Sequence, residues 1–410
     1  MTRRVFGAVA VAALSGITLA GDAAAESVDL AGKRRRPDFR GMWVASVANR
    51  DWPSKPGLPA SEQRAQLIAL LDTAVARRLN TVILQVRPTA DALWPSTFEP
   101  WSAYLTGVQG QHPGWDPLGT AVAEAHKRGL ELHAWFNPYR VAGHTDPTRL
   151  APTHPARLHP DWVVPYGGKL YYNPGLPEVR RFVQDAMLDA VRRYPIDAVH
   201  WDDYFYPYPV AGQVFDDDAA FARHGQGFPD RAAWRRHNTD QLVRQMATRI
   251  PQVRKGVRFG ISPFGVWRNR ASDPLGSDTA AGVQTYDDLH ADVRMWIKRN
   301  WIDYVVPQLY WNIGFEVADY AKLAPWWADV VRGTRVRLYL GEALYKAGDP
   351  AQPAPWQDPA ELSRHLTLAK ELPQVRGHAY FSGREVATDP FGAMARVVAD
   401  HYQDDPAGRP

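Results

Sequence analysis

A buried strand near the middle of the chain runs into a group of acids and aromatic rings: Ala198-Val199-His200-Trp201-Asp202-Asp203-Tyr204-Phe205-Tyr206-Pro207. Its first half alternates small or polar residues with bulky apolar ones, as a strand covered on both faces does. Its second half carries two adjacent carboxylates where the strand should end. Carboxylates transfer protons or attack carbon, and aromatic rings stack on sugar faces. This segment therefore predicts a site that cleaves glycosidic bonds.

Similar strand-like runs occur before and after this segment and alternate with amphipathic stretches. Strands are expected at residues 39–47, 81–88, 130–138, 198–204, 258–264, 304–310, 336–340 and 377–381. Helices are expected at residues 65–79, 116–128, 177–194, 231–250, 286–299, 317–331, 358–371 and 390–401. Eight β–α repeats predict an α/β fold, a (β/α)8 TIM barrel with long βα loops. A doubly wound open sheet is the alternative, but no glycine-rich phosphate loop follows the first strand.

The first 25 residues of the 410 have the features of a signal peptide. Arg3 and Arg4 precede an apolar run over residues 5–20, and small residues follow at 23–25. Residues 26–37 are expected to form a disordered tail, and residues 38–403 a single barrel domain. The expected location is therefore outside the cytoplasm, in the periplasm or the extracellular space. No cysteine follows the apolar run, so no stable membrane anchor is expected.

Bulk composition narrows the partners and cofactors. The chain has no cysteine, which excludes disulfides and thiolate metal sites. Its net charge of +4 is weak and spread along helices, so no nucleic-acid groove is expected. No cofactor and no metal are expected, the expected partner is a glycan, and a monomer is expected.

Alternation along each strand sorts side chains between the barrel interior and the helix layer. His200 and Asp202 are expected to face inward. Asp203 follows where the chain turns, so it is expected either to reach the rim or to bond the loop backbone. Glu342 is expected in phase with Leu340, at the rim of the barrel. The same sorting places further polar and aromatic side chains inside the barrel or at its mouth: Gln85, Arg87, His133, Trp135, Asn137, Arg140, Ser262, Gln308, Tyr310, Tyr345, His378 and Tyr380.

These side chains suit a polyol that has one apolar face. Catalytic roles are expected for Asp202, Asp203 and Glu342. Substrate contacts are expected from Arg87, His133, Trp135, Asn137, Arg140, His200, Gln308, Tyr310 and Tyr345. Each assignment has a structural alternative: the acids pair with an arginine, the histidines are satisfied in the core, and the amides only support the loops.

Six short motifs occur in order along the chain. They are Arg40-Gly41-Met42-Trp43-Val44, Leu84-Gln85-Val86-Arg87-Pro88, His133-Ala134-Trp135-Phe136-Asn137-Pro138-Tyr139-Arg140, His200-Trp201-Asp202-Asp203-Tyr204-Phe205-Tyr206-Pro207, Ile261-Ser262-Pro263-Phe264-Gly265-Val266-Trp267-Arg268 and Val306-Pro307-Gln308-Leu309-Tyr310-Trp311. Together they resemble the bacterial glycosyl-hydrolase-like family ten, from about residue 38 to residue 385. Three aromatic residues inside these motifs join the expected substrate contacts: Tyr204, Trp267 and Trp311.

The resemblance implies a TIM-barrel glycoside hydrolase exported to the cell envelope. One branch of that family cleaves peptidoglycan glycan strands stripped of their stem peptides. The resemblance also implies acid roles at Asp202 and Asp203, with Glu342 as a further match.

The expected reaction is hydrolysis of a β-linked glycan that contains N-acetylhexosamines. Because adjacent residues of a strand point to opposite sides, Asp202 is expected to work with Glu342 rather than with Asp203. A mechanism in which the substrate's acetamido group assists, with one acid and a stabilising Asp, stays open. A non-catalytic glycan-binding barrel is one alternative. A metal-dependent hydrolase, with His133, His200 and Asp202 as ligands, is another.

Overall fold

The computed structural model describes residues 38–404, so the predicted signal peptide and tail lie outside the described residues. Eight parallel strands close into a barrel in the order β1-β11-β10-β9-β8-β7-β3-β2. They are β1 (Phe39–Val44), β2 (Thr81–Arg87), β3 (Glu131–Phe136), β7 (Ala198–Trp201), β8 (Arg258–Ile261), β9 (Tyr304–Val305), β10 (Arg337–Glu342) and β11 (Val375–Phe381). The predicted TIM barrel is confirmed.

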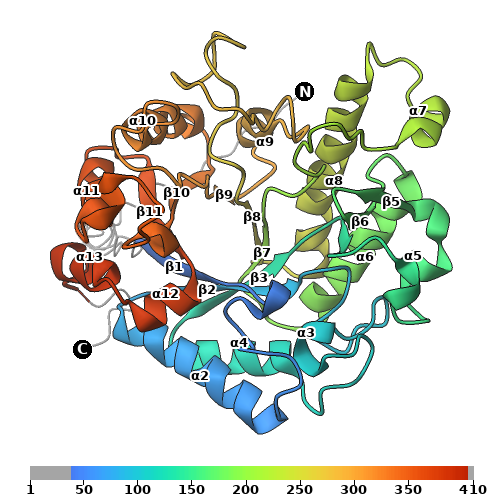
Figure 1. Ribbon diagram of the computed structural model, residues 1–410, viewed down its shortest axis with the longest axis horizontal. Helices are drawn as coiled ribbons and strands as arrows, with labels where there is room; N and C mark the ends of the chain where they lie inside the picture. Colours follow the sequence, from blue (N-terminus) through green and yellow to red (C-terminus); the bar gives the residue numbers. More distant parts are fainter. Residues whose placement is uncertain (1–37, 405–410) are drawn as a thin grey trace, which may run out of the picture. The chain divides into compact units, whose positions relative to one another are not determined.

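Helices surround the strands (Figure 1). Those that follow the barrel strands are α2 (Ala60–Ala76), α4 (Pro117–Lys127), α6 (Pro177–Arg193), α8 (Arg231–Val253), α9 (Val293–Lys298), α10 (Tyr320–Val331), α11 (Glu361–Lys370) and α13 (Ala393–His401). Several begin at an acid that caps the helix. The Asp116 side chain accepts a hydrogen bond from the Gly119 N–H, and Asp292 accepts one from Met295. Asp292 thus starts α9 later than the helix period alone predicts.

One of the long βα loops, the segment after β3, contains a small antiparallel sheet in the order β4-β6-β5. Its strands are β4 (Arg140–Ala142), β5 (Val163–Tyr166) and β6 (Lys169–Tyr172). An apolar cluster lies under it and joins it to the loop after β7: Val164, Tyr166, Tyr171, Tyr206 and Phe215. Short helices occupy other loops: α3 (Ala103–Thr106), α5 (Pro155–Leu158), α7 (Asp218–His224) and α12 (Gly383–Thr388).

Large rings fill the barrel interior. Tyr304 reaches across it and its hydroxyl bonds Nδ1 of both His133 (2.9 Å) and His200 (3.0 Å). Trp43 donates its indole N–H to His200 Nε2 at 3.1 Å. A Cβ at Gly260 would lie 1.9 Å from the Tyr304 ring, so only glycine leaves room for that ring. The interior below the mouth is therefore a packed core.

Strands β10 and β11 present the opposite faces from those expected. Tyr339 and Ala379 belong to the interior cluster, whereas Leu340 and Tyr380 pack in the helix layer. The Tyr339 ring stacks on Phe39 with 4.0 Å between centroids. Because Tyr339 faces the barrel interior, the residues in phase with Leu340, including Glu342, face outward.

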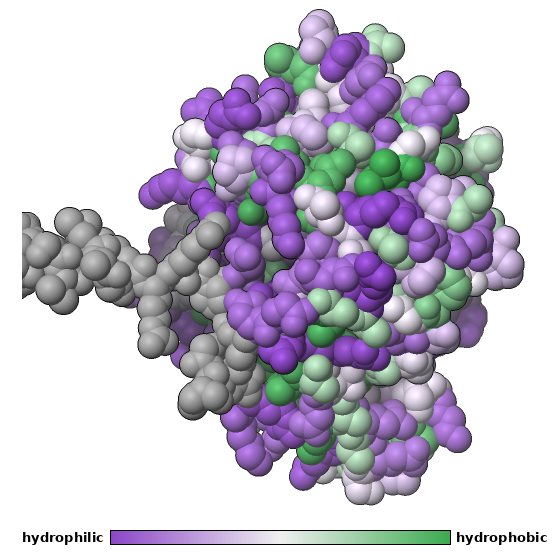
Figure 2. Space-filling model, turned by 90° about the vertical axis from the view of Figure 1, so that its left-hand side faces the viewer, coloured by the Kyte–Doolittle hydropathy of each residue, from purple (hydrophilic) through white to green (hydrophobic). Residues whose placement is uncertain are grey.

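No helix among residues 38–404 is long and apolar enough to cross a membrane. Figure 2 shows one side of the molecule, on which hydrophilic residues are interspersed with smaller groups of apolar ones.

Candidate active site

A cavity of about 270 Å³, here called the cup, lies at the carboxyl ends of the barrel strands. Its lining comes from many parts of the chain: Trp43, Ala45, Val47, Arg50, Gln85, Trp135, Arg140, Asp202, Asp203, Tyr204, Tyr208, Ser262, Gln308, Tyr310 and Phe381. TIM-barrel enzymes keep their active sites at this end of the barrel.

Asp202 lines the cup directly after β7 and is 6% exposed. Its Oδ2 accepts a hydrogen bond from the Asn137 side-chain amide, and its Oδ1 accepts one from the Tyr204 N–H at 3.4 Å. Gln85 in turn donates to Asn137 Oδ1 at 2.6 Å and accepts from the backbone of Val47 at 2.9 Å. Asn137 is fully buried and absent from the lining, so its effect on the cup is to orient Asp202.

Asp203 also lines the cup and is 5% exposed. The Tyr208 hydroxyl donates a hydrogen bond to its Oδ2, and the Gln308 amide lies close enough to do the same. Gln308 is held by hydrogen bonds from its amide to Ser262, at 3.0 Å to the carbonyl oxygen. The carboxyl of Asp203 therefore has fixed neighbours inside the cavity.

Both adjacent carboxyls have a raised pKa. Burial, followed by repulsion from Asp203, raises the pKa of Asp202 to about 7. Burial likewise raises the pKa of Asp203, although its hydrogen bond from Tyr208 opposes the rise. Since like charges this close resist ionising together, the pair holds one proton near neutral pH.

Asp203 takes one of the two placements expected for it and reaches the rim, whereas the expectation that it points away from Asp202 is wrong. Strict alternation holds only while the backbone is a regular strand, and β7 ends at Trp201. Beyond Trp201 the chain turns, and both carboxyls reach the same cavity. The cup therefore contains a carboxyl pair from one short segment.

Arg140 is the cation beside this pair. It begins β4, whose pairing with Tyr171 of β6 fixes its backbone. Its guanidinium donates to the Pro88 carbonyl oxygen at 2.9 Å and to Asn137 Oδ1 at 3.0 Å, and it lies 5.3 Å from the Tyr204 ring centroid. Its charge lowers the pKa of Asp202, against the larger effect of burial.

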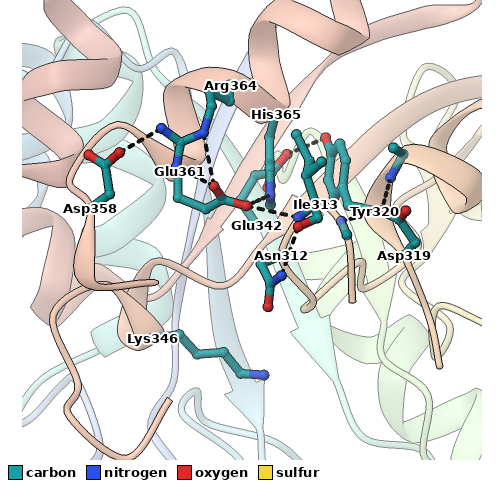
Figure 3. A network of polar contacts seen from close by, with 12 residues as sticks. Asn312, Ile313, Asp319, Tyr320, Glu342, Lys346, Asp358, Glu361, Arg364 and His365 are labelled. Carbon is teal, nitrogen blue, oxygen red and sulfur yellow. Dashed lines mark hydrogen bonds and ion pairs between the residues drawn. The ribbon is translucent and has the colours of Figure 1, made fainter. Parts of the chain in front are cut away.

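Glu342 does not reach the cup, contrary to the expectation for a rim residue. It is 0% exposed and accepts a hydrogen bond from the Tyr320 hydroxyl at 2.8 Å. His365 and His378 each place Nδ1 within 2.9 Å of its carboxylate. Figure 3 shows Glu342 beside Tyr320 of α10 and His365 of α11. Burial alone would raise its pKa, but the charge of His365 lowers the pKa of Glu342 to about 2.

Arg87 also lies outside the cup. The register of β2 against β3 shifts between Gln85 and Arg87, which takes the arginine out of phase with the inward-facing glutamine. Its guanidinium forms a fully buried ion pair with Glu99, with 2.7 Å between Nε and Oε2. It also donates to the carbonyl oxygens of Asn137 and Pro138. Arg87 therefore supports the backbone that carries Asn137.

His133 and His200, both expected to contact substrate, face the barrel interior but do not line the cup. Both bond Tyr304, and burial lowers the pKa of each. They do not join Asp202, so the structure does not assemble the alternative metal triad. Among residues 38–404, no three His, Asp or Glu side chains come together as a metal site would need.

Three expected aromatic contacts, Tyr345, Trp311 and Trp267, do not line the cup. Tyr345 packs against Tyr310 and Phe381, with ring centroids 6.0 Å apart in both cases. Trp311 packs edge-on against Phe264. Trp267 packs against Tyr286 and Trp326 further out.

Several lining residues were not expected in the site. Trp43 and Tyr208 lie in or beside the quoted motifs, so an acid-centred search along those motifs could have found them. Phe381 ends a strand whose phase was misassigned. Arg50, in the loop after β1, carries no local sequence signal, and its guanidinium lies over the Phe381 ring at 4.9 Å.

Comparisons with known proteins identify the family and the fold. Residues 38–358 match the family described as Glycosyl hydrolase-like 10. The chain is 50% identical over 367 residues to Glycosyl hydrolase YngK of Bacillus subtilis (strain 168), covering 89% of this chain and 72% of that one. It is 42% identical over 363 residues to Glycosyl hydrolase DigH of Escherichia coli (strain K12), covering 84% and 82%. The solved PgaB (BpsB) glycoside hydrolase domain from Bordetella bronchiseptica shares the fold, with a TM-score of 0.55 at 14% identity, covering 88% of this chain and 98% of that one.

Proposed function

Because the chain belongs to the Glycosyl hydrolase-like 10 family, and is thus a glycoside hydrolase, we propose that it cleaves peptidoglycan glycan strands that lack stem peptides. The observation that carries the site assignment is the carboxyl pair Asp202 and Asp203 in one ring-lined cup. The cup is slightly smaller than pockets for drug-sized ligands, which suits about one sugar ring. Export to the envelope is part of the proposal and rests on the signal features of residues 1–25.

The placement of the two acids favours assistance by the substrate. A double displacement by two enzyme carboxyls needs one on each side of the scissile bond. Neighbouring residues of one segment, facing one cavity, suit a different division of labour. One of them protonates the leaving oxygen, and the other orients an acetamido group on the sugar itself. This arrangement requires an N-acetylhexosamine at the cleaved bond.

The proton held by the pair assigns the two roles. Asp202 donates its proton to the glycosidic oxygen as the bond from that oxygen to C1 breaks. The acetamido carbonyl oxygen attacks C1 and forms a cyclic intermediate, while the Asp203 carboxylate accepts a hydrogen bond from the acetamido N–H. Water then attacks C1, the bond between C1 and the acetamido oxygen breaks to restore the acetamido group, and the Asp202 carboxylate takes the proton that water loses. The anomeric configuration is retained after these two inversions.

Digestion of defined glycans tests the proposal. Peptide-stripped peptidoglycan should yield new reducing ends, identified by mass spectrometry, whereas intact peptidoglycan should yield few. Proton NMR of the first product should show retained configuration. A glucose oligosaccharide of equal length, which lacks the acetamido group, should not be cleaved. Inverted product, or cleavage of the glucose chain at a similar rate, would remove the acetamido mechanism.

The rate of glycan hydrolysis should have a bell-shaped dependence on pH. Activity needs Asp202 protonated, so the alkaline limb should fall through about pH 7, the value to which burial and Asp203 raise its pKa. Activity also needs Asp203 ionised, so the rate should fall again in acid. That acid limb should lie above the usual pH for an aspartate, because burial raises the Asp203 pKa. Measuring kcat/KM against pH checks this dependence. A value of kcat/KM that does not change up to pH 9 would contradict it.

Replacing Arg140 with glutamine should move the alkaline limb of the pH–rate profile to higher pH. The arginine charge favours the ionised form of Asp202, so its loss lets the carboxyl keep its proton to higher pH. The normalised profile of kcat/KM against pH measures the shift. Arg376→Gln, an exposed arginine at the other end of β11, is the matched control and should leave the limb in place. A limb that moves toward lower pH would show that Arg140 does not act on the acid.

A further inference from the structure

A second and larger cavity, of about 550 Å³, lies between the loops after β2 and β3. Its lining includes Thr89, Asp91, Tyr104, His144, Arg149 and Arg157. The catalytic scheme uses none of these residues.

Two elements connect this cavity to the cup. Arg140 lines the cup, and the next residue, Val141, lines the second cavity. Tyr104 lines the second cavity while its hydroxyl lies within reach of the Ala48 backbone, next to Val47 of the cup. Tyr104 is also close enough to Arg140 for that charge to favour its ionised form. Neighbouring residues thus line both cavities, which places the second cavity beside the cup.

A buried acid gives the cavity a polar surface. Asp91 is 1% exposed and lines the cavity. It accepts hydrogen bonds from the Gln109 side chain at 3.2 Å and from the Thr89 N–H at 3.3 Å. Burial raises the pKa of Asp91 to about 6. Carboxyl and amide groups at such positions bond sugar hydroxyls.

The charged groups of the lining are mostly basic. Arg149 is exposed and makes no side-chain hydrogen bond to another part of residues 38–404. Arg157 donates to the carbonyl oxygens of Thr148 and Leu150, at 3.2 and 2.8 Å, so it also holds the loop. His144 places a buried Nδ1 here without a partner in the described part of the chain. The nearby Asp146 accepts hydrogen bonds from Thr148 and lies outside the lining.

We propose that this second cavity is a further sugar subsite, which binds a carboxylate-bearing sugar of the same glycan strand through Arg149. The inference rests on the proposed function and extends it. Arginine binds carboxylates through charge-assisted hydrogen bonds. A sugar whose carboxyl carries a peptide is an amide there and has no charge to offer. The subsite thus gives a physical reason for preferring strands without stem peptides.

Binding to a variant that does not turn over tests the subsite. In an Asp202→Asn background, calorimetry would compare three hexasaccharides: peptide-free peptidoglycan with free carboxylates, the same compound as its methyl ester, and N-acetylglucosamine hexasaccharide. Adding Arg149→Ala should weaken binding of the free acid about tenfold, the scale of a hydrogen bond to a charged group. Binding of the two neutral compounds should change less than about twofold. Arg376→Ala, at the far end of the barrel, should change none of the three.

Other results separate the subsite from the proposed function. If wild-type protein cleaves peptide-stripped glycan but Arg149→Ala binds the acid and its ester with unchanged affinities, the subsite is wrong and the function stands. An equal loss for acid and ester would overturn the carboxylate assignment. If the wild-type protein cleaves no glycan and the Asp202→Asn variant binds no hexasaccharide, both proposals fail.

Discussion

Replacing Asp202 with asparagine should lower the rate of glycan hydrolysis by about 10²- to 10⁴-fold, the scale of a positioned acid–base group. Asparagine keeps the shape of the side chain but has no proton of suitable acidity for the leaving oxygen. The measurement is kcat on peptide-stripped peptidoglycan. Near-native turnover by the variant would remove Asp202 from the mechanism.

The same substitution should leave the fold intact or slightly more stable. The Asp202 pKa is raised in the folded protein, so its ionisation opposes folding as pH rises above the ordinary value for an aspartate. Urea unfolding at pH 8 should therefore show no loss of stability.

Asp240 provides a matched control for this experiment. It is a half-buried aspartate of α8 whose pKa burial also raises to about 7, and it accepts a hydrogen bond from Trp296 outside the cup. Asp240→Asn makes the same chemical change and should leave turnover unchanged. Equal losses in Asp240→Asn and Asp202→Asn would indicate a general effect of removing buried carboxyls.

Replacing Glu342 with glutamine should destabilise the protein by about 3 kcal/mol, the scale for removing one partner of a buried ion pair. The Glu342 carboxylate is the acceptor shared by Tyr320, His365 and His378. An amide cannot accept from all three, so at least one buried group loses its partner. The free energy of unfolding in urea measures the effect. Glu371→Gln, an exposed acid that ends α11, should change it by less than about 0.5 kcal/mol.

The difference in unfolding free energy between wild type and Glu342→Gln should depend on pH, because the pKa values of Glu342 and His365 are shifted in opposite directions. The Glu342 pKa is lowered to about 2, so its contribution is present above an ordinary carboxyl pKa and is lost as pH falls toward about 2. The His365 pKa is raised mainly by Glu342, against burial, so its contribution is present below an ordinary imidazole pKa and is lost as pH rises through the raised value. The stability gap should be largest between about pH 5 and 6.5. A gap that is equal at pH 3 and pH 6 would contradict this account.

Glu342→Gln also separates structure from catalysis. The variant should keep its kcat under conditions where it is folded, because Glu342 is fully buried, bonds Tyr320 of α10 and His365 of α11, and does not line the cup. A large loss of kcat in folded protein would return Glu342 to the candidate acids.

Sequence periodicity predicted the position of a residue correctly where that position depended on its neighbours along the chain. Each barrel strand is a short run that must be apolar on both faces, so the runs stood out and predicted the barrel. The phase of β7 was also readable from its alternation: Trp201 packs in the helix layer against Phe259, and His200 faces the interior beside Tyr304. These are local constraints, and local patterns record them.

The direction of side chains at strand ends could not be predicted from periodicity. Alternation stops where the strand stops, so the sequence alone could not place Asp203 in the same cavity as Asp202. A shift in register likewise removed Arg87 from the cup.

The sequence by itself determined the barrel and the family, and it singled out the acid pair as the candidate site, because buried strands and short motifs consist of consecutive residues. Only the tertiary structure decided which carboxyls share a cavity. It joined Asp202 to Asp203, Asn137 and Arg140, and it enclosed Glu342 among Tyr320, His365 and His378. The physical reason is that burial and charge pairing depend on residues that are distant in the chain and meet only when the barrel closes.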